Sequence, residues 1–527
     1  MNNNKFVILS INFATEKMKK RRVRVRFAPS PTGPLHLGGV RTALYNYLFA
    51  KKNGGDFILR IEDTDQNRFV PGAEQYIVDA LNWCNIIIDE GVSVGGVKGP
   101  YKQSERKNIY RQYVEQLIES GNAYYAFDST EELTVMRERL KSAGVAAPQY
   151  NAVTRTGMKN SLTLPNEEVR ARLARKDNYV IRVKMPRNEG VKFNDNIRGW
   201  VRVSTNNLDD KVLFKSDGMP TYHLANVVDD YLMDISHVIR GEEWLPSAPL
   251  HVLLYRYLGW ENSIPEFAHL PLILRPDGKG KLSKRDGDRL GFPVFPMSWE
   301  NPETKEKSSG YKERGYYPEA FNNMLAFLGW NPGTAQELFN MPELVNAFSL
   351  DRVGRAGAKF DFVKTNWFNQ QYLRMYSGKE LASQLRPLLK KEGLEPESSF
   401  LEAVCELMKE RATFVEDILK EGRYFFVPPN SYDEKTIRKK WKEETPEIIS
   451  ELSMLLKELV FFDVESISSC FKTFLKSKGL NFGEVMPGFR VSVTGLGAGA
   501  SMNEIAALLG KEEVIKRIQT ALTKINK

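Results

Sequence analysis

Apolar and polar positions near the N-terminus follow first the period of a strand and then that of a helix. Residues 23–27 (VRVRF) alternate with a period of two, which predicts a β-strand that ends near Ala28. Apolar residues then recur at helical spacing over residues 40–48, and the Asn-Gly-Gly run at 53–55 ends the helix. Residues 56–62 (DFILRIE) predict a second strand, apolar enough to be buried on both faces. The pattern therefore indicates a βαβ unit with a parallel sheet.

The pattern changes twice later in the chain. Three stretches alternate like antiparallel strands, namely 180–186 (VIRVKMP), 191–204 (VKFNDNIRGWVRVS) and 211–218 (KVLFKSDG). Residues 297–315 are polar and rich in turn-forming residues, so we expect a surface loop there. From about residue 318 the spacing is helical almost throughout. The clearest helical stretches are 318–330, 379–394, 399–422 and 512–526.

Length, cysteine use and charge narrow the class of protein. A chain of 527 residues is too long for one core and predicts three to five domains. Its three cysteines, Cys84, Cys405 and Cys470, lack CxxC spacing, so we expect neither a disulfide framework nor a zinc site. The net charge of +9 is concentrated in residues 1–26, which contribute +7. Nucleic acid would therefore have to be bound by local basic patches on a balanced surface.

The N-terminal tail does not resemble a secretion signal. Its apolar stretch is short, is broken by Asn12 and lacks a small-residue cleavage pattern. We expect residues 1–21 to form a disordered basic tail, and we leave open whether residues 1–17 belong to the functional chain. No stretch of the sequence approaches the roughly 18 apolar residues of a membrane span. We therefore expect a cytoplasmic protein.

The turn between the first strand and the first helix has the features of a phosphate site. It reads FAPSPTGPLHLGG over residues 27–39 and lies where parallel sheets bind nucleotides. Gly38 and Gly39 have no Cβ, so a ligand can approach their backbone closely. The helix start offers unpaired N–H groups, and His36 adds a donor, although a histidine in this place can also be a simple helix cap. One crevice would then hold Arg26, Ser30, His36 and Glu62.

A basic segment follows about 245 residues after His36. Residues 281–287 (KLSKRDG) carry cations at Lys281, Lys284 and Arg285, and residues 276–280 (PDGKG) before them predict a turn. A mobile loop of this charge is suited to closing over a triphosphate as negative charge builds on the leaving pyrophosphate. Taken alone, the segment is equally consistent with a solvated surface loop.

The two segments together resemble the HIGH and KMSKS signatures of class I aminoacyl-tRNA synthetases. Further stretches resemble the bacterial-type glutamyl-tRNA synthetases in that family's order and approximate spacing, over most of residues 23–290. These stretches are LRIEDTD (59–65), GPYKQSER (99–106), GMPTYHLANVVDD (218–230) and VIRGEEW (238–244). Residues 30–32 (SPT) differ from the corresponding segment of the related glutaminyl enzymes, which favours glutamate. One departure is Gly39, which stands at the second histidine position of the first signature.

The chemistry of glutamate agrees with the resemblance. Two carboxylates and one ammonium require at least one guanidinium and one carboxylate in the site. Selection against glutamine would depend on Arg240, because a guanidinium prefers an anion to a neutral amide, and Glu62 would supply the charge for the ammonium. Arg26 adds a second forked donor. The resemblance implies a glutamate site made of Arg26, Pro29, Ser30, Pro31, Glu62, Tyr222, Asn226 and Arg240.

The resemblance also implies which residues handle ATP. The ATP-binding set is His36, Gly38, Gly39, Glu243, Leu274 and Lys284, and the catalytic set is His36, Lys281, Ser283, Lys284 and Arg285. No covalent nucleophile is needed, because both chemical steps gain mainly from positioning and from stabilised phosphate charge. Mg²⁺ is implied by the triphosphate without dedicated protein ligands, and we interpret Asp63 and Asp65 as structural. In this family, glutamate activation waits for tRNA.

The family further implies the domain organisation. We expect a Rossmann-like parallel-sheet catalytic domain with an α+β acceptor-binding insertion, followed by an all-α anticodon-binding region. The expected boundaries are 22–103 and 223–275 for the catalytic halves, 104–222 for the insertion, 276–364 for a stem-contact domain and 365–527 for the helical domains. The expected partners are tRNA(Glu), L-glutamate and ATP, with no membrane, and the protein is expected to be a monomer.

Two other classes of function stay open at this point. A small-molecule adenylyltransferase would share the phosphate loop and the parallel sheet, but would not need the long helical C-terminal half. A non-catalytic tRNA-binding protein would tolerate loss of His36 or of the basic segment, and both are present. Length excludes a shortened glutamyl-type enzyme that modifies a tRNA nucleoside. The sequence does not reveal whether tRNA(Gln) is also charged, or which helical residues read the anticodon.

Overall fold

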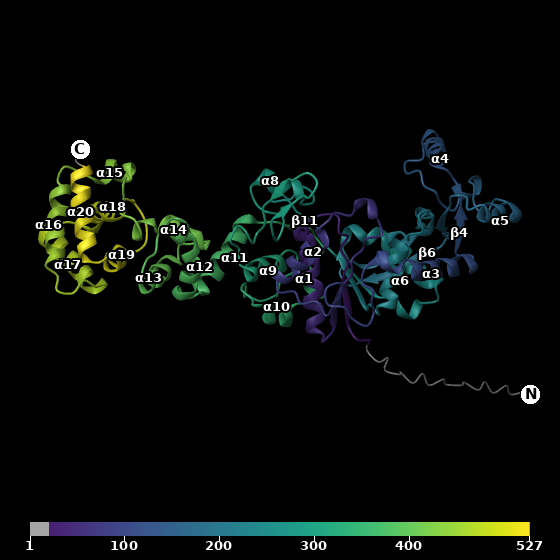
Figure 1. The fold of residues 1–527 in the computed structure, drawn as a ribbon, viewed down its shortest axis with the longest axis horizontal. Helices are drawn as coiled ribbons and strands as arrows, with labels where there is room; N and C mark the ends of the chain where they lie inside the picture. The colour runs from purple at the N-terminus through teal and green to yellow at the C-terminus, as the bar shows by residue number, and fades with distance from the viewer. Residues whose placement is uncertain (1–20, 526–527) are drawn as a thin grey trace, which may run out of the picture.

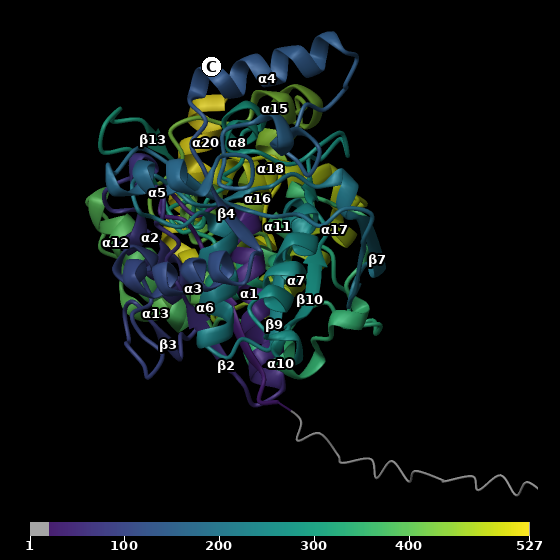
Figure 2. The same cartoon turned by 90° about the vertical axis from the view of Figure 1, so that its right-hand side faces the viewer.

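The computed structural model describes residues 21–525, except for the side chains of Lys284, Arg285 and Asp288. The prediction of a disordered tail therefore lies almost wholly outside the described residues. The molecule is elongated, with helices α4 (Thr130–Ser142) and α5 (Asn166–Ala174) at one end and the C-terminal helices at the other (Figure 1). Seen from the first end, α4 lies along one edge of the molecule (Figure 2).

The N-terminal unit has the predicted βαβ order. Strand β1 (Arg24–Phe27) is followed by helix α1 (Leu37–Lys52), and β1 pairs in parallel with β2 (Asp56–Leu59). Strand β3 (Glu90–Gly91) adds to β2, also in parallel. Strand β2 ends three residues earlier than predicted, because Ile61 instead bonds through its backbone to Tyr101 and Gln103.

A second sheet continues this arrangement. Its strand order is β7 (Gly199–Ser204), β6 (Gly190–Asp195), β10 (Glu266–Leu270) and β9 (His237–Gly241), with β6, β10 and β9 parallel. Strand β9 lies beside β1, where the Ser236 N–H donates to the Arg24 carbonyl at 2.9 Å. The carboxyl ends of β1, β2 and β9 thus open on the same side, where the site lies.

The strands predicted between residues 180 and 218 are antiparallel as expected, but they belong to two sheets. Strands β4 (Ala123–Ala126), β5 (Val180–Val183) and β8 (Val212–Phe214) form one antiparallel sheet. The β6–β7 hairpin instead pairs with β10 and extends the second sheet. Sequence alternation identifies these strands without identifying their partners.

Helices cover the sheets. They are α2 (Ala73–Trp83), α3 (Lys107–Glu119), α6 (Tyr222–Leu232), α7 (Ala248–Tyr257), α9 (Pro318–Ala326), α10 (Met341–Ala347) and α11 (Phe362–Met375). Strands β11 (Ile273–Leu274) and β14 (Ala358–Lys359) pair in parallel beside the site. Helices α9 and α11 share one hydrophobic core with β1 and β2.

The segment 297–315 is not simply a surface loop. It contains a short hairpin of β12 (Trp299–Glu300) and β13 (Lys307–Ser308). Trp299 packs edge-on against Tyr76, and Tyr311 is fully buried. The prediction is wrong for these aromatic residues, which anchor an otherwise polar segment.

The C-terminal half is helical as predicted and has its own core. Its helices are α12 (Gly378–Lys391), α13 (Ser398–Met408), α14 (Val415–Glu421), α15 (Glu434–Lys440), α16 (Thr445–Lys457), α17 (Val464–Lys478), α18 (Phe482–Thr494), α19 (Met502–Leu509) and α20 (Lys511–Ile525). The helical stretch 399–422 is divided between α13 and α14, because the Asp417 carboxylate accepts from the N–H groups of Thr413 and Phe414 and starts a new helix.

The fold shows the environment of the three cysteines and the hydropathy of the helices. Cys84 and Cys405 are buried and Cys470 is half-buried, and all three are free thiols. Among residues 21–525, no helix has the length and hydropathy required to cross a bilayer.

Candidate active site

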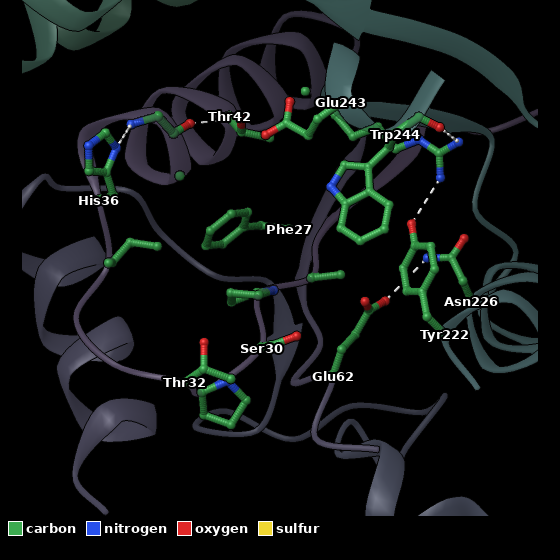
Figure 3. A pocket seen from close by; sticks show the side chains of 18 of the residues that line it. Phe27, Ser30, Thr32, His36, Thr42, Glu62, Tyr222, Asn226, Glu243 and Trp244 are labelled. Carbon is green, nitrogen blue, oxygen red and sulfur yellow. Dashed lines mark hydrogen bonds between the residues drawn. The ribbon is translucent and has the colours of Figure 1, made fainter. Parts of the chain in front are cut away.

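A cavity of about 1020 Å³ opens at the carboxyl ends of β1, β2 and β9. His36 lies towards one end of it, and Glu62, Tyr222 and Asn226 lie at the other (Figure 3). All eight predicted glutamate residues line this cavity, and so do the following residues predicted for ATP or catalysis: His36, Gly38, Gly39, Glu243, Lys281 and Ser283. Leu274 is not among the lining residues, although its neighbour Ile273 is. The predicted roles of the Lys284 and Arg285 side chains lie outside what the structure describes.

His36 is the N-cap of α1. Its Nδ1 accepts from the Gly38 N–H at 3.1 Å, which orients the ring at the edge of the cavity. Because Nδ1 is the acceptor, the neutral imidazole carries its proton on Nε2. His36 therefore caps the helix through Nδ1, and as a consequence Nε2 is the ring nitrogen that can donate a hydrogen bond.

The two glycines at the helix start differ in what they permit. A Cβ on Gly39 would lie 2.6 Å from Leu35 Cδ1, so a side chain there would displace a buried leucine. A Cβ on Gly38 would meet only His36 Nδ1, at an ordinary 3.6 Å. Gly39 is thus explained by packing within the protein, which accounts for the departure from the family signature, whereas Gly38 leaves the backbone open to the cavity.

Hydrogen bonds and a buried leucine attach both ends of the basic segment to the rest of the protein. Gly278 and Gly280 have positive φ and form the predicted turn, and the Leu282 N–H donates to the Ile273 carbonyl at 2.8 Å. Leu282 is buried in the core, and helix α8 (Lys284–Leu290) begins directly after Ser283. The Ser283 hydroxyl donates to Asp286 Oδ2 at 2.6 Å. The segment is therefore fixed at one end to β11 and at the other to a short helix.

An ion pair joins this segment to the opposite wall. Lys281 Nζ lies 2.8 Å from Glu243 Oε1. Burial tends to raise the pKa of Glu243, but the hydrogen bonds from Lys281 and from the backbone, together with the charges of Lys281 and Arg41, outweigh burial, and the pKa is lowered. Glu243 therefore stays ionised near neutral pH and holds the start of the basic segment against the cavity.

Arg240 at the end of β9 is buried among neutral acceptors. Its NH1 donates to the Tyr222 hydroxyl at 3.0 Å and lies 3.4 Å from His251 Nδ1. Its Nε donates to His269 Nε2 at 3.0 Å, and its NH2 donates to the Trp244 carbonyl at 3.3 Å. Within the described residues, no carboxylate forms an ion pair with this guanidinium. A buried cation that lines a cavity without an anionic partner is suited to binding an anion.

The neighbouring histidines do not offset or add to this charge. Burial and the charge of Arg240 lower the pKa of His251 well below its usual value. Burial likewise lowers the pKa of His223, to about 4, and this ring lies 3.3 Å from His251. Both rings are therefore neutral at physiological pH and act as hydrogen-bonding scaffolds around Arg240.

Glu62 supplies the carboxylate of the site. Its Oε1 accepts from Asn226 Nδ2 at 3.2 Å (Figure 3). The same oxygen accepts from Arg60 NH2 at 3.0 Å. The Glu62 N–H donates to the Pro29 carbonyl at 3.0 Å, which ties the carboxylate to the Pro-rich turn. Burial raises the pKa of Glu62, with the charges of Arg60 and Arg26 opposing the change. A bound cation would favour the ionised form of this carboxyl group.

Arg26 differs from Arg240 in having its own carboxylate. It donates to both carboxylate oxygens of Asp230, at 3.0 and 3.2 Å. Arg60, fully buried, also donates to Asp230, at 2.7 Å. Burial tends to raise the pKa of Asp230, but the charges and hydrogen bonds of Arg26 and Arg60 outweigh burial, and the pKa is lowered. Arg26 therefore lines the cavity as part of a compensated ionic network.

Residues 99–106 brace this network from outside the cavity. Arg106 Nε and Gln103 Nε2 donate to the two oxygens of Asp229, at 2.7 and 2.8 Å. The Ser104 N–H donates to Asp63 Oδ1 at 2.8 Å, which gives Asp63 a structural role. Among the residues that the structure describes, no group of three or more His, Cys, Asp or Glu side chains is placed to hold a metal ion.

Several residues of the site were not anticipated from the sequence. Arg60, Asp229 and Asp230 fall within the stretches quoted for the resemblance, but nothing in their spacing shows that they are buried together. Arg60 and Asp230 are separated by 170 residues and meet only because β2 and α6 are neighbours in the fold. His251 and His269 were not singled out, since an isolated histidine in an apolar stretch carries no local signal.

Comparison with known proteins identifies the family. The family model described as tRNA synthetases class I (E and Q), catalytic domain, matches residues 22–367, and the anticodon binding domain model matches residues 380–522. Glutamate–tRNA ligase from Cytophaga hutchinsonii is 56% identical over 503 residues, covering 95% of this chain and 97% of the relative. The corresponding ligase from Phocaeicola vulgatus is 56% identical over 506 residues, covering 96% and 99%. A crystal structure of a glutamate tRNA ligase from Elizabethkingia meningosepticum in complex with its amino acid superposes with a TM-score of 0.91, at 51% identity and covering 96% of this chain and 100% of that one. With these matches over nearly its whole length, the chain belongs to the class I glutamyl-tRNA synthetase family.

Proposed function

We propose that the protein is a glutamate–tRNA ligase, which uses ATP to activate L-glutamate and transfers the glutamyl group to the 3′ end of tRNA(Glu). The observation that carries this proposal is that one cavity has two ends of different chemistry. A buried, uncompensated guanidinium and a carboxylate lie at one end, and a glycine-rich helix start with a basic segment lies at the other.

The amino-acid end matches the charges of glutamate. Arg240 would bind the side-chain carboxylate, and Tyr222, whose oxygen already accepts from Arg240, has its own hydroxyl proton left to donate. Glu62, oriented by Asn226, would bind the ammonium group. Arg26, Pro29, Ser30 and Pro31 line the same cavity.

The first chemical step is adenylate formation. A glutamate α-carboxylate oxygen attacks the α-phosphorus of ATP, the new acyl–oxygen–phosphorus bond forms, and the bond to the β-phosphate oxygen breaks. Pyrophosphate leaves with the bonding electron pair. His36, the N–H groups at the start of α1, Lys281 and, from the family resemblance, Lys284 and Arg285 would stabilise the charge on the phosphates. Glu243 and the backbone near Leu274 would border the nucleotide.

Magnesium would enter with the nucleotide. Of the two carboxylates considered from the sequence, Asp63 already accepts from Ser104 and Gln66. In the part of the chain that the structure describes, no group of three or more His, Cys, Asp or Glu side chains is placed to hold the ion. Its ligands would be phosphate oxygens and water, and we assign no step to it.

The second step is transfer to tRNA. The oxygen of the terminal ribose hydroxyl attacks the glutamyl carbonyl carbon, the bond from that carbon to the phosphate oxygen breaks, and AMP leaves with the bonding electron pair, while the hydroxyl proton passes to the phosphate of AMP or to solvent. The insertion at 104–222 would position the acceptor end, residues 276–364 would contact the stem, and the helical domains from 365 would read the anticodon. We propose that the protein acts as a monomer in the cytoplasm.

A charging assay tests the proposal against its rivals. The full-length protein is incubated with ATP and labelled glutamate, with purified tRNA(Glu) or tRNA(Gln), and ATP–pyrophosphate exchange is followed with and without tRNA. We expect charging of tRNA(Glu) and exchange that requires tRNA. Brisk exchange with no response to any tRNA would support a small-molecule adenylyltransferase, and tRNA binding without exchange would support a non-catalytic tRNA-binding protein.

A further inference from the structure

Behind Arg240 lies a chain of two further polar side chains that do not line the cavity. Arg240 Nε donates to His269 Nε2 at 3.0 Å, and His269 Nδ1 lies 2.6 Å from Asp195 Oδ2. The His269 and Asp195 side chains are both completely buried. The three residues come from the neighbouring strands β9, β10 and β6, and His269 lies directly opposite Arg240 in the strand register.

The arrangement fixes where the histidine proton resides. A guanidinium N–H can only donate, so His269 Nε2 must be the acceptor and cannot carry a proton. Burial lowers the pKa of His269, with the Asp195 hydrogen bond opposing, so the ring is neutral and its single proton lies on Nδ1. Nδ1–H therefore donates to the Asp195 carboxylate. Burial tends to raise the pKa of Asp195, but hydrogen bonds from His269 and from backbone N–H groups lower it.

We propose that Asp195 and His269 are positioning residues for substrate selection, which hold the Arg240 guanidinium in place and leave its charge available to the side-chain carboxylate of the substrate. This inference rests on the proposed role of Arg240 as the selector of glutamate. Neither residue touches the substrate in this account, and both act through Arg240.

The contrast with Arg26 explains why an imidazole is placed between the two charges. Asp230 binds Arg26 directly and with both oxygens, which neutralises that guanidinium at contact distance. Asp195 is instead one ring away from Arg240, so it orients the imidazole without occupying the guanidinium with an anion. The sheet thereby supplies a fixed acceptor for Nε while the charge of Arg240 stays uncompensated at the cavity.

Asp195 also has a structural duty, and the two duties use different oxygens. Its Oδ1 accepts from the N–H groups of Ile197 and Arg198, at 3.0 and 2.8 Å, in the turn between β6 and β7. Its Oδ2 accepts from His269. Asp195→Asn can keep the turn acceptor at Oδ1 while presenting an NH₂ group to His269. That change forces the histidine proton onto Nε2, where it meets the Arg240 Nε–H, so two donors face each other.

The test is a comparison of kcat/KM for glutamate and for glutamine in the full-length protein with tRNA present. Asp195→Asn is expected to lower kcat/KM for glutamate by about 10- to 100-fold, the range for a disturbed hydrogen bond to a charged group, mostly through KM. Use of glutamine should fall less, so the glutamate-to-glutamine ratio should drop. Asp210→Asn is the matched control, because Asp210 is a completely buried carboxylate with a backbone donor, Met185, and belongs to the β4–β5–β8 region. It should leave the ratio unchanged even where it lowers Tm.

Variants of His269 test the same link without changing the turn. His269→Phe removes the acceptor and should reproduce the loss of selectivity, whereas His269→Gln offers an oxygen near the Nε2 position and should restore part of it. If Asp195→Asn does not fold, these two variants decide the question. Because the chain has only five histidines, nitrogen NMR of labelled protein can also report directly whether the His269 proton resides on Nδ1.

The outcomes separate this inference from the function on which it rests. A drop in the ratio for Arg240→Ala, together with an unchanged ratio for Asp195→Asn and His269→Phe, would overturn the positioning role and leave the role of Arg240 intact. An unchanged ratio for Arg240→Ala would instead overturn the selector itself. A His269 proton found on Nε2 in the unaltered protein would contradict the proposed orientation in either case.

Discussion

The two ends of the cavity are built in opposite ways. The amino-acid end consists of buried or half-buried side chains, each held by hydrogen-bond partners at fixed distances, as for Arg240, Tyr222 and Glu62. The phosphate end consists of a helix start and a basic segment whose ion pair, Lys281–Glu243, is about half exposed, with side-chain exposures of 55% and 44%.

This difference corresponds to two chemical tasks. To discriminate between a carboxylate and an amide, the site needs a charged group that cannot move to accommodate the amide. A guanidinium that is buried on a rigid sheet meets this requirement. Stabilisation of a leaving pyrophosphate requires cations that can approach as charge develops, and an exposed segment between two anchored ends supplies them. Substitutions at the two ends should therefore have different kinetic signatures.

The largest effect is expected at the amino-acid end. Arg240→Ala should lower kcat/KM for glutamate by about 3 kcal/mol or more, roughly 150-fold, because a charged substrate group is left unpaired in a desolvated site. Steady-state charging of tRNA(Glu) measures it. Arg240→Lys is the matched control, since it keeps the charge without the fork and should recover part of the loss. A loss of less than 3-fold in Arg240→Ala would show that the guanidinium does not bind the substrate.

At the phosphate end we expect a loss of activity of comparable size, but in the rate of glutamate activation and not in KM for glutamate. Lys284→Ala should lower the rate of glutamate activation by about 100-fold, on the scale of one preorganised charge stabiliser, with KM for glutamate nearly unchanged. ATP–pyrophosphate exchange in the presence of tRNA measures both constants. Unaltered exchange would remove Lys284 from the catalytic set, and a rise confined to KM for glutamate would contradict the separation of the two ends.

Glu62 provides a pH-dependent test of the amino-acid end. Burial raises the pKa of this carboxyl group, and only its ionised form binds an ammonium. KM for the substrate glutamate should therefore rise as the pH falls. This rise should begin at a higher pH than it would if the Glu62 carboxyl group had the ordinary pKa of a glutamate side chain. Glu62→Gln should raise KM about 10-fold, the cost of roughly one charged hydrogen bond, and should flatten this pH dependence. A wild-type KM that stays constant from about pH 8 down to about pH 4.3, the ordinary glutamate pKa, would exclude Glu62 from ammonium binding.

The smallest effect is expected for the ion pair across the cavity. Glu243→Gln should change the free energy of unfolding by less than about 1 kcal/mol, because exposed ion pairs contribute little. Chemical denaturation measures this change, and KM for ATP should shift by no more than about 3-fold on the same scale. A large rise in KM for ATP would show that Glu243 contributes to nucleotide binding well beyond its ion pair with Lys281.

Local patterns predicted the parts of the fold whose partners are close in sequence. The alternation in residues 23–27, the helix over residues 40–48 and the parallel pairing of β1 with β2 follow from period and connection length, and the structure confirms them. The predicted cavity residues also fall together, because strand ends in a parallel sheet share one edge.

Local sequence patterns did not predict which strands and side chains pair when they are far apart in the sequence. The β6–β7 hairpin alternates like any antiparallel pair, and nothing local shows that it joins β10. The link from Asp195 to His269 spans 74 residues, and its components resemble ordinary polar residues until three strands align. In residues 297–315, a polar majority concealed the buried Tyr311. These features depend on tertiary contacts and not on sequence period.

One ratio decides whether the buried guanidinium of Arg240, which has no anionic partner among the described residues, selects the substrate. That ratio is kcat/KM for glutamate over kcat/KM for glutamine, measured with the same tRNA(Glu) preparation for the wild type and Arg240→Ala. The wild type should strongly prefer glutamate, and this preference should fall by at least about 10-fold in the variant, because the neutral amide loses less than the anion when the guanidinium is removed. An equal loss for both amino acids, leaving the ratio unchanged, would contradict this role of Arg240.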